Sequence, residues 1–99
     1  MPLSENQKKH LRRAGHPIKP VVTIGDAGLT DAVLREFDAT INHHELIKVK
    51  VRAGDRDSRN AIIDSLCQRG EAELVDRIGN VALVFRRNVN EPRVALPGR

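Results

Sequence analysis

The chain has 99 residues, of which 39% are hydrophobic and 30% are charged, and this balance is typical of one soluble globular domain. No apolar stretch approaches the ~20 residues that a membrane-spanning helix needs, and the first residues lack the apolar core of a secretion signal. The single cysteine, Cys67, cannot form an intramolecular disulfide. We therefore expect a cytoplasmic protein in a reducing compartment, without membrane contact.

The charge balance favours a polyanionic partner. There are 17 Lys and Arg against 13 Asp and Glu, and the basic residues gather in three blocks, 1–20, 48–59 and 86–99, which acidic stretches separate. Phe37 and Phe85 are the only large aromatic residues, too few for both a core and the exposed stacking surface of an RNA-recognition motif or cold-shock barrel. A mildly basic protein without such a partner is the alternative that net charge leaves open.

The first predicted elements are a helix and a short strand. Ser4 and Gln7 have the spacing of a capping box, and Gly15 is the expected stop, so a helix is predicted from about residue 5 to 14. It presents a narrow apolar stripe and a basic face. The β-branched run at 21–24 predicts a buried strand.

A second helix and an alternating strand follow. Thr30 is the expected N-cap of a helix that runs to about Asn42 or His43. From Leu46 to Arg52 the residues alternate, so Ile47, Val49 and Val51 should share one face of a strand and Lys48, Lys50 and Arg52 the other. A solvated sheet face is the alternative to a stripe that contacts phosphates.

The last predicted elements are a helix and a hairpin. Asp57 or Ser58 is expected to cap the third helix and Gly70 to end it. Strands are predicted at 71–78 and 81–85, with a tight turn between them. From about residue 88 the chain has no periodicity, so we expect a mobile or loosely docked tail.

The predicted order is αβαβαββ. Strand–helix–strand units give parallel pairs, whereas the final hairpin is antiparallel. We therefore expect one domain over residues 1–99, a compact α/β sandwich with a mixed four-stranded sheet.

A loop with two glycines, Gly25–Gly28, lies between the first strand and the second helix. Glycines let a backbone approach a ligand closely, and a GxxG loop in this context is how KH domains clamp a nucleic-acid backbone. The alternative is a simple strand-to-helix turn. Asp26 counts against phosphate binding, because its carboxylate would lie where an anion should sit.

Other chemistry finds little support in the sequence. The segment from His43 to Lys48 lacks the second histidine of an H-E-x-x-H zinc motif, and the remaining His and Cys residues do not have the spacing of metal ligands. Cys67 lies on an apolar helix stripe, as a buried structural thiol would. We expect no catalytic residue, no metal, no cofactor and no small-molecule substrate, and so a protein that is not an enzyme.

Taken together, these segments resemble the YhbY-type proteins, which are single free-standing CRM (chloroplast RNA splicing and ribosome maturation) domains. The resemblance covers nearly the whole chain in order. It rests on Leu3-Ser4 before the basic helix, His16-Pro17 through Lys19-Pro20-Val21-Val22, Ile24 to Thr30, His43 to Lys50, Ile78-Gly79-Asn80 leading into Val81 to Arg86, and Ala95-Leu96-Pro97.

The resemblance implies a fold similar to the C-terminal domain of translation initiation factor three, with KH-like use of the GxxG loop. It also implies RNA binding, and for a single copy ribosomal RNA in precursors of the large ribosomal subunit rather than intron splicing. A protein-interaction adaptor, docking on ribosomal or RNA-processing proteins through the acidic second helix, is the alternative. The candidate RNA-binding residues are Lys8, Lys9, Arg12, Arg13, Lys19, Gly25, Asp26, Ala27, Gly28, Lys48, Lys50 and Arg52.

Overall fold

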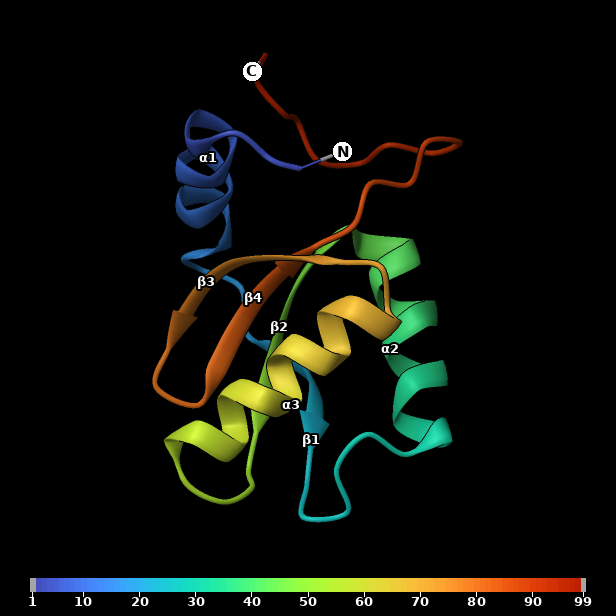
Figure 1. Ribbon diagram of the computed structural model, residues 1–99. Coiled ribbons are helices and arrows are strands. Elements are labelled where there is room, and N and C mark those ends of the chain that lie inside the picture. The colour runs from blue at the N-terminus through green and yellow to red at the C-terminus, as the bar shows by residue number, and fades with distance from the viewer. Residues whose placement is uncertain (1, 99) are drawn as a thin grey trace.

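A computed structural model describes residues 2–98 of the chain (Figure 1). The order αβαβαββ is confirmed, and within these residues no helix is long and apolar enough to cross a membrane. The elements are α1 (Glu5–Gly15), β1 (Pro20–Ile24), α2 (Asp31–His44), β2 (Leu46–Val51), α3 (Arg56–Arg69), β3 (Glu73–Ile78) and β4 (Val81–Phe85).

The four strands form one mixed sheet, as predicted, with the order β1-β2-β4-β3. β1 pairs with β2 in parallel, and β4 is antiparallel to both β2 and β3. The second parallel pair that the strand–helix–strand pattern predicts is not formed. β3 runs in the same direction as β2, but β4 inserts between them because the hairpin places its second strand against β2.

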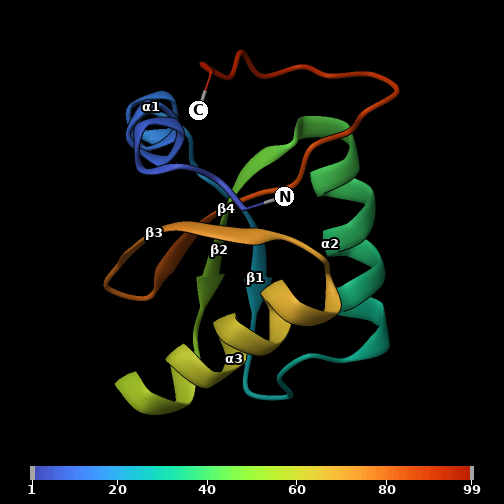
Figure 2. The same cartoon turned by 45° about the horizontal axis from the view of Figure 1, so that its top comes forward.

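Helices α2 and α3 cover one face of the sheet with the main hydrophobic core (Figure 2). Phe37 and Ile41 from α2 and Ile63 and Leu66 from α3 are fully buried there. Burying each such side chain stabilises the fold by about 1.5–3 kcal/mol relative to exposure. The sheet contributes to this cluster Val22, Ile24, Ile47, Val49, Val51, Ala82 and Val84.

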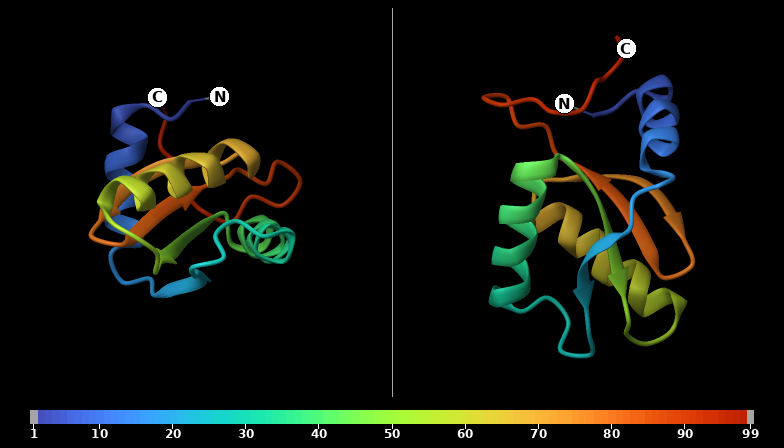
Figure 3. Two further views of the ribbon diagram at one scale, coloured as in Figure 1. Left: turned by 60° about the horizontal axis from the view of Figure 1, so that its bottom comes forward. Right: turned by 180° about the vertical axis from the view of Figure 1, so that it is seen from behind.

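Helix α1 packs on the opposite face, against one part of the sheet only (Figure 3). Leu11 is the buried residue of its stripe and joins a cluster that contains Leu46 and Leu83. The helix runs one residue further than the predicted end at about residue 14, so Gly15 belongs to it. This glycine is the last helical residue, and an added Cβ would lie 2.6 Å from the Leu83 side chain. The glycine is needed because α1 approaches the sheet closely at this point.

The N-caps of the helices follow the sequence with one exception. Ser4 and Gln7 form the predicted capping box, and the Val33 amide donates to Thr30 Oγ1 at 3.2 Å. The third helix begins earlier than predicted, because Asp55 is its cap and accepts from the Ser58 amide at 2.8 Å. That hydrogen bond, and a second from the Ser58 side chain, lower the pKa of the Asp55 carboxyl.

The first strand is less buried than its β-branched sequence predicts. β1 is an edge strand, and its residues alternate between exposed and buried. Val22 and Ile24 face the main core, whereas Val21 is 48% exposed. The sequence predicts burial on both faces of the strand because Val21 and Val22 are both apolar, but only Val22 reaches the core.

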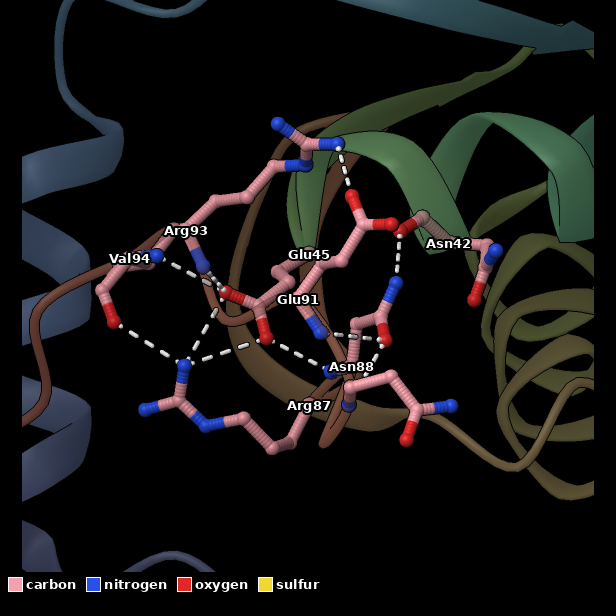
Figure 4. A network of polar contacts seen from close by, with 8 residues as sticks. Asn42, Glu45, Arg87, Asn88, Glu91, Arg93 and Val94 are labelled. Carbon is pink, nitrogen blue, oxygen red and sulfur yellow. Dashed lines mark hydrogen bonds and ion pairs between the residues drawn. The ribbon is translucent and has the colours of Figure 1, made fainter.

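A buried carboxylate organises the segment after β4 (Figure 4). Glu45, between α2 and β2, is fully buried with φ +65°, a conformation that is rare for residues with a side chain. Its carboxylate accepts from the backbone amides of Asn88, Arg93 and Val94 at 2.6, 2.6 and 2.8 Å, and from Arg87 Nη1 at 3.0 Å. Burial alone would raise the pKa of Glu45, but these hydrogen bonds outweigh it and lower the pKa.

Two further contacts hold the same segment. Val94 and Leu96 pack against the cluster beneath α1, and Gln7 Nε2 donates to the Pro97 carbonyl at 2.9 Å. Together with the Glu45 hydrogen bonds, these contacts join the fold to the segment for which the sequence predicts a mobile or loosely docked tail. The sequence of this segment has no periodic pattern that would predict the docking. Its backbone amides donate to the Glu45 carboxylate and not to a neighbouring helix or strand.

Candidate nucleic-acid interface

The uncovered part of the sheet carries two of the predicted cations. Lys48 and Lys50 alternate along β2 with Ile47 and Val49, which are buried under α2 and α3. The two lysines therefore leave the sheet on the face that α1 covers only in part. Both are partly exposed, and neither forms an ion pair within residues 2–98.

The basic helix and the basic strand meet on this face. Arg12, His16 and Lys48 line one groove, and Lys48 Nζ donates to the His16 carbonyl at 3.3 Å. Lys8 precedes Arg12 by one helical turn and so shares its side of α1. The first two basic blocks of the sequence thus converge in space.

The other cations of α1 and its following loop lie elsewhere. Lys9 and Arg13 line a shallow depression that includes Pro97, on a different side of α1 from the groove. Lys19 is exposed in the connection to β1. These three residues are accessible, but they are not part of the surface that Arg12 and Lys48 share.

The GxxG loop lies at the far end of the same sheet. The Arg52 amide donates to the Ile24 carbonyl at 2.8 Å, so Arg52 is beside the start of the loop. Within the loop the Gly28 amide donates to the Gly25 carbonyl at 3.0 Å, which closes a tight turn. Gly28 has φ +74°, and nothing lies within 4 Å of a Cβ added to either glycine. The loop backbone is therefore open to an approaching ligand.

Two exposed residues lie between the glycines. Asp26 and Ala27 are both at the surface, and the Asp26 side chain makes no hydrogen bond or ion pair with any of residues 2–98. No turn hydrogen bond occupies its carboxylate. Asp26 is thus an exposed negative charge in the loop that would oppose a phosphate there.

The described arginines of the third basic block are all in ion pairs. Arg86 pairs with Asp38 at 2.6 Å, and Arg87 pairs with the buried Glu45. Arg93 pairs with Glu91 at 3.1 Å. Carboxylates of the same chain therefore pair with all three arginines of this block within residues 2–98.

The groove beneath α1 also has an apolar floor. Its volume is about 270 Å³, and Val81 and Leu83 of β4 and Ile78 of β3 line it. Ile78 is 73% exposed, which is unusual for a large aliphatic residue on a strand. Asp76 lies in the same groove, and its Oδ1 accepts from the Arg77 amide at 2.9 Å. The sequence analysis missed this groove, since its lining comes from α1, the residue after it and all four strands.

Among residues 2–98, the histidine and cysteine side chains belong to no cluster that could hold a metal ion. His43 and His44 stack edge to face at the C-terminal end of α2, with ring centroids 4.7 Å apart, where the helix dipole favours them. Burial and then the Asp64 carboxylate raise the pKa of the Cys67 thiol to about 11. Cys67 is therefore protonated at neutral pH and a poor nucleophile.

Comparison with known families matches most of the chain to one domain family. The sequence profile of the CRS1/YhbY (CRM) domain matches residues 3–86, from the start of α1 to the end of β4. The chain belongs to this family. The profile match spans the cationic surface, the GxxG loop and Glu45, whereas the docked segment after Arg86 lies beyond it.

Individual relatives carry names that refer to RNA. A protein of Pseudomonas aeruginosa named a probable RNA-binding protein is 46% identical over 88 residues, which are 89% of this chain and 85% of that protein. A Haemophilus influenzae protein named RNA-binding protein is 40% identical over 96% of this chain and 95% of its own length.

A solved structure shares the fold. The solution structure of a Staphylococcus aureus protein, described as a hypothetical protein and candidate RNA binder, superposes with a TM-score of 0.84. It is 30% identical, and the alignment covers 97% of this chain and all of that one. The predicted α/β class with its mixed four-stranded sheet is thus confirmed.

Proposed function

We propose that this protein binds RNA through a surface that runs from α1 along β2 to the GxxG loop. The observation that carries the proposal is a line of cations with no internal carboxylate partner among residues 2–98: Arg12, Lys48, Lys50 and Arg52. Unpaired cations on a common face attract a phosphate backbone and gain counterion-release energy on binding. Lys8, Lys9, Arg13 and Lys19 would extend this field, and Gly25 to Gly28 would allow close approach of the backbone.

The recognition that we propose is mainly of RNA shape and backbone. Phe37 and Phe85 are 0% and 4% exposed, so neither can stack on a base. Without an aromatic platform, contacts with phosphates and ribose supply most of the binding free energy. The protein would act without catalysis, as a binding factor.

We further propose that the RNA is ribosomal RNA in cytoplasmic precursors of the large ribosomal subunit. The support is the resemblance to free-standing CRM domains and the RNA-binding names of its relatives. Sedimentation of a cell extract through a sucrose gradient tests this assignment. The protein should move with particles of the large subunit, and a ribonuclease treatment should return it to the top of the gradient.

The test of RNA binding reverses two charges on β2. Lys48→Glu combined with Lys50→Glu should weaken binding of protein-free ribosomal RNA by about a hundredfold or more, the loss of two charge-assisted contacts. The melting temperature should change little, since partly exposed charges contribute under about 1 kcal/mol. Binding is measured by fluorescence anisotropy and stability by thermal melting.

The matched control makes the same charge change on the helical face. Arg35→Glu combined with Arg69→Glu alters two exposed cations of α2 and α3 that are in no ion pair of the described chain. It should retain most of the affinity. Equal losses in the two double variants would contradict the proposed surface. Binding to ribosomal particles but not to protein-free RNA would instead favour the protein-interaction adaptor, docking through α2.

A further inference from the structure

We propose that the groove beneath α1 binds one unstacked RNA base, and that it prefers guanine. The inference rests on the RNA binding proposed above and adds a base-specific contact to it. The groove has three kinds of lining in one place: an apolar floor, a cationic rim and a single carboxylate. Each matches a different part of a nucleotide.

The floor matches the face of a base. Val81 and Leu83 are side by side on β4, and Ile78 faces Val81 across the hairpin. A flat base laid on these side chains would cover Ile78, which is otherwise 73% exposed. Aliphatic contacts replace the aromatic stacking that this chain lacks.

The rim matches the phosphate of the same nucleotide. Arg12 and Lys48 come from α1 and β2 and line one groove, and neither has a carboxylate partner among residues 2–98. His16, the C-cap of the helix, lines the same groove, and its carbonyl accepts from Lys48 Nζ. A phosphate at the rim would meet two positive charges while its base points toward the floor.

The carboxylate matches the donor edge of guanine. Asp76 lines the groove, and its Oδ1 already accepts from the Arg77 amide, which leaves Oδ2 without a partner in the described chain. A carboxylate in this position repels a phosphate but accepts hydrogen bonds from N–H groups. Guanine offers a ring N–H and an amino group side by side, whereas uracil has one N–H between two carbonyl groups that a carboxylate would repel.

The size of the groove argues against other occupants. Its volume of about 270 Å³ lies just below the range of roughly 300–1,000 Å³ for pockets that hold drug-sized ligands, so it fits a single base. A second copy of the chain would need about 800 Å² of buried surface on each partner, far more than this groove offers.

The test compares two single-stranded RNA hexamers, one all uridine and one with a central guanosine, by fluorescence anisotropy. The wild-type protein should prefer the guanosine hexamer by about fivefold or more. Ile78→Glu should weaken its binding by about tenfold, the scale of one lost base contact. Val89→Glu is the matched control, because Val89 is 81% exposed and receives the same charge. It should cost less than about twofold. Ile78→Ser repeats the test without a charge.

The specificity test removes only the charge of Asp76. Asp76→Asn should raise the affinity for the all-uridine hexamer, because a repulsion of phosphate is lost. It should also abolish the preference for guanosine, because the hydrogen bonds from guanine to the carboxylate are lost. Equal losses for Ile78→Glu and Val89→Glu, or a preference that survives in Asp76→Asn, would overturn the groove assignment while RNA binding stands. If the wild-type protein forms a dimer and Ile78→Glu dissociates it, the groove would bind a second copy of the chain instead of a base. Failure of the wild-type protein to bind any RNA, ribosomal RNA included, would instead reject the proposed function itself.

Discussion

The fold uses the basic residues of α1 and β2 differently from the basic residues that follow β4. Arg12 on α1 and Lys48 on β2 face a shared groove without internal carboxylate partners among residues 2–98. Arg86 and Arg87, just after β4, are held by Asp38 and Glu45. In the sequence the two sets look alike, because both are short basic blocks beside apolar strands.

The two sets of basic residues differ because the fold places carboxylates beside Arg86 and Arg87 but not beside Arg12 and Lys48. Asp38 and Glu45 are more than forty residues before their arginine partners in the chain. An arginine engaged by such a carboxylate stabilises the fold and adds little attraction for an outside anion. The net charge of a segment therefore overestimates the number of cations available for binding, because it also counts the cations that are in ion pairs with carboxylates of the same chain.

The largest effect should be a loss of stability when the hydrogen bonds and the ion pair of Glu45 are removed. Glu45→Ala removes the acceptor of three backbone amides and the ion-pair partner of Arg87, which would keep its hydrogen bond to the Val94 carbonyl. Loss of one partner of a buried charge network costs about 3–5 kcal/mol. The melting temperature should fall by more than about 10 °C. Circular dichroism melts measure it.

The matched control for Glu45 is Glu91, the exposed partner of Arg93. Glu91→Ala should cost less than about 1 kcal/mol, the usual worth of a surface ion pair. Similar melting temperatures for the two alanine variants would show that the Glu45 carboxylate does not hold the C-terminal segment.

A smaller effect should appear with pH. The hydrogen bonds to Glu45 lower its pKa in the folded protein below the ordinary value of 4.5. Its contribution to stability is therefore complete above the unfolded-state pKa and is lost as pH falls through the folded-state pKa. Urea denaturation between about pH 6 and 3 should show a falling free energy of unfolding, with a weaker pH dependence in Glu45→Gln. Parallel pH profiles for the two proteins would contradict this origin.

These two regions also mark how far the sequence predicts the structure. Local signals were sufficient for the elements: the capping box at Ser4, the cap at Thr30 and the alternation along β2 are all present. The cap of α3 was misplaced, because Asp55, Asp57 and Ser58 can all serve as caps and only the tertiary fold selects among them.

Long-range contacts were harder to foresee. Glu45 binds backbone amides that no residue type marks, so the docking of the C-terminal segment has no sequence pattern. The groove combines Arg12, Lys48 and Ile78 from three elements, and only the insertion of β4 beside β2 brings them together. The cations on α1 and β2 were identified individually, but their convergence is a property of the fold.

The carboxylate of Asp26, in the GxxG loop, provides the next test. Asp26→Lys should tighten RNA binding by roughly 1–2 kcal/mol if the GxxG loop touches phosphate, since a repulsion is lost and a charge-assisted contact is gained. Glu36→Lys is the control, because Glu36 is an exposed residue of α2 that receives the same change. Equal gains in the two variants would show that Gly25 and Gly28 serve only the turn.

The smallest effect is a change in salt dependence, and it separates the two sets of cations directly. Each neutralised phosphate adds about −0.7 to −0.9 to the slope of log affinity against log salt, so four to six contacts predict a slope near −3 to −5. Arg12→Gln should make this slope shallower by about 0.7–0.9, which is about a threefold difference over a fourfold change in salt. Arg86→Gln removes the same charge from a residue paired with Asp38, so its slope should match that of the wild type. If Arg86→Gln reduced the slope as much as Arg12→Gln, internal pairing would not withhold an arginine from RNA, and the C-terminal arginines would belong to the binding surface.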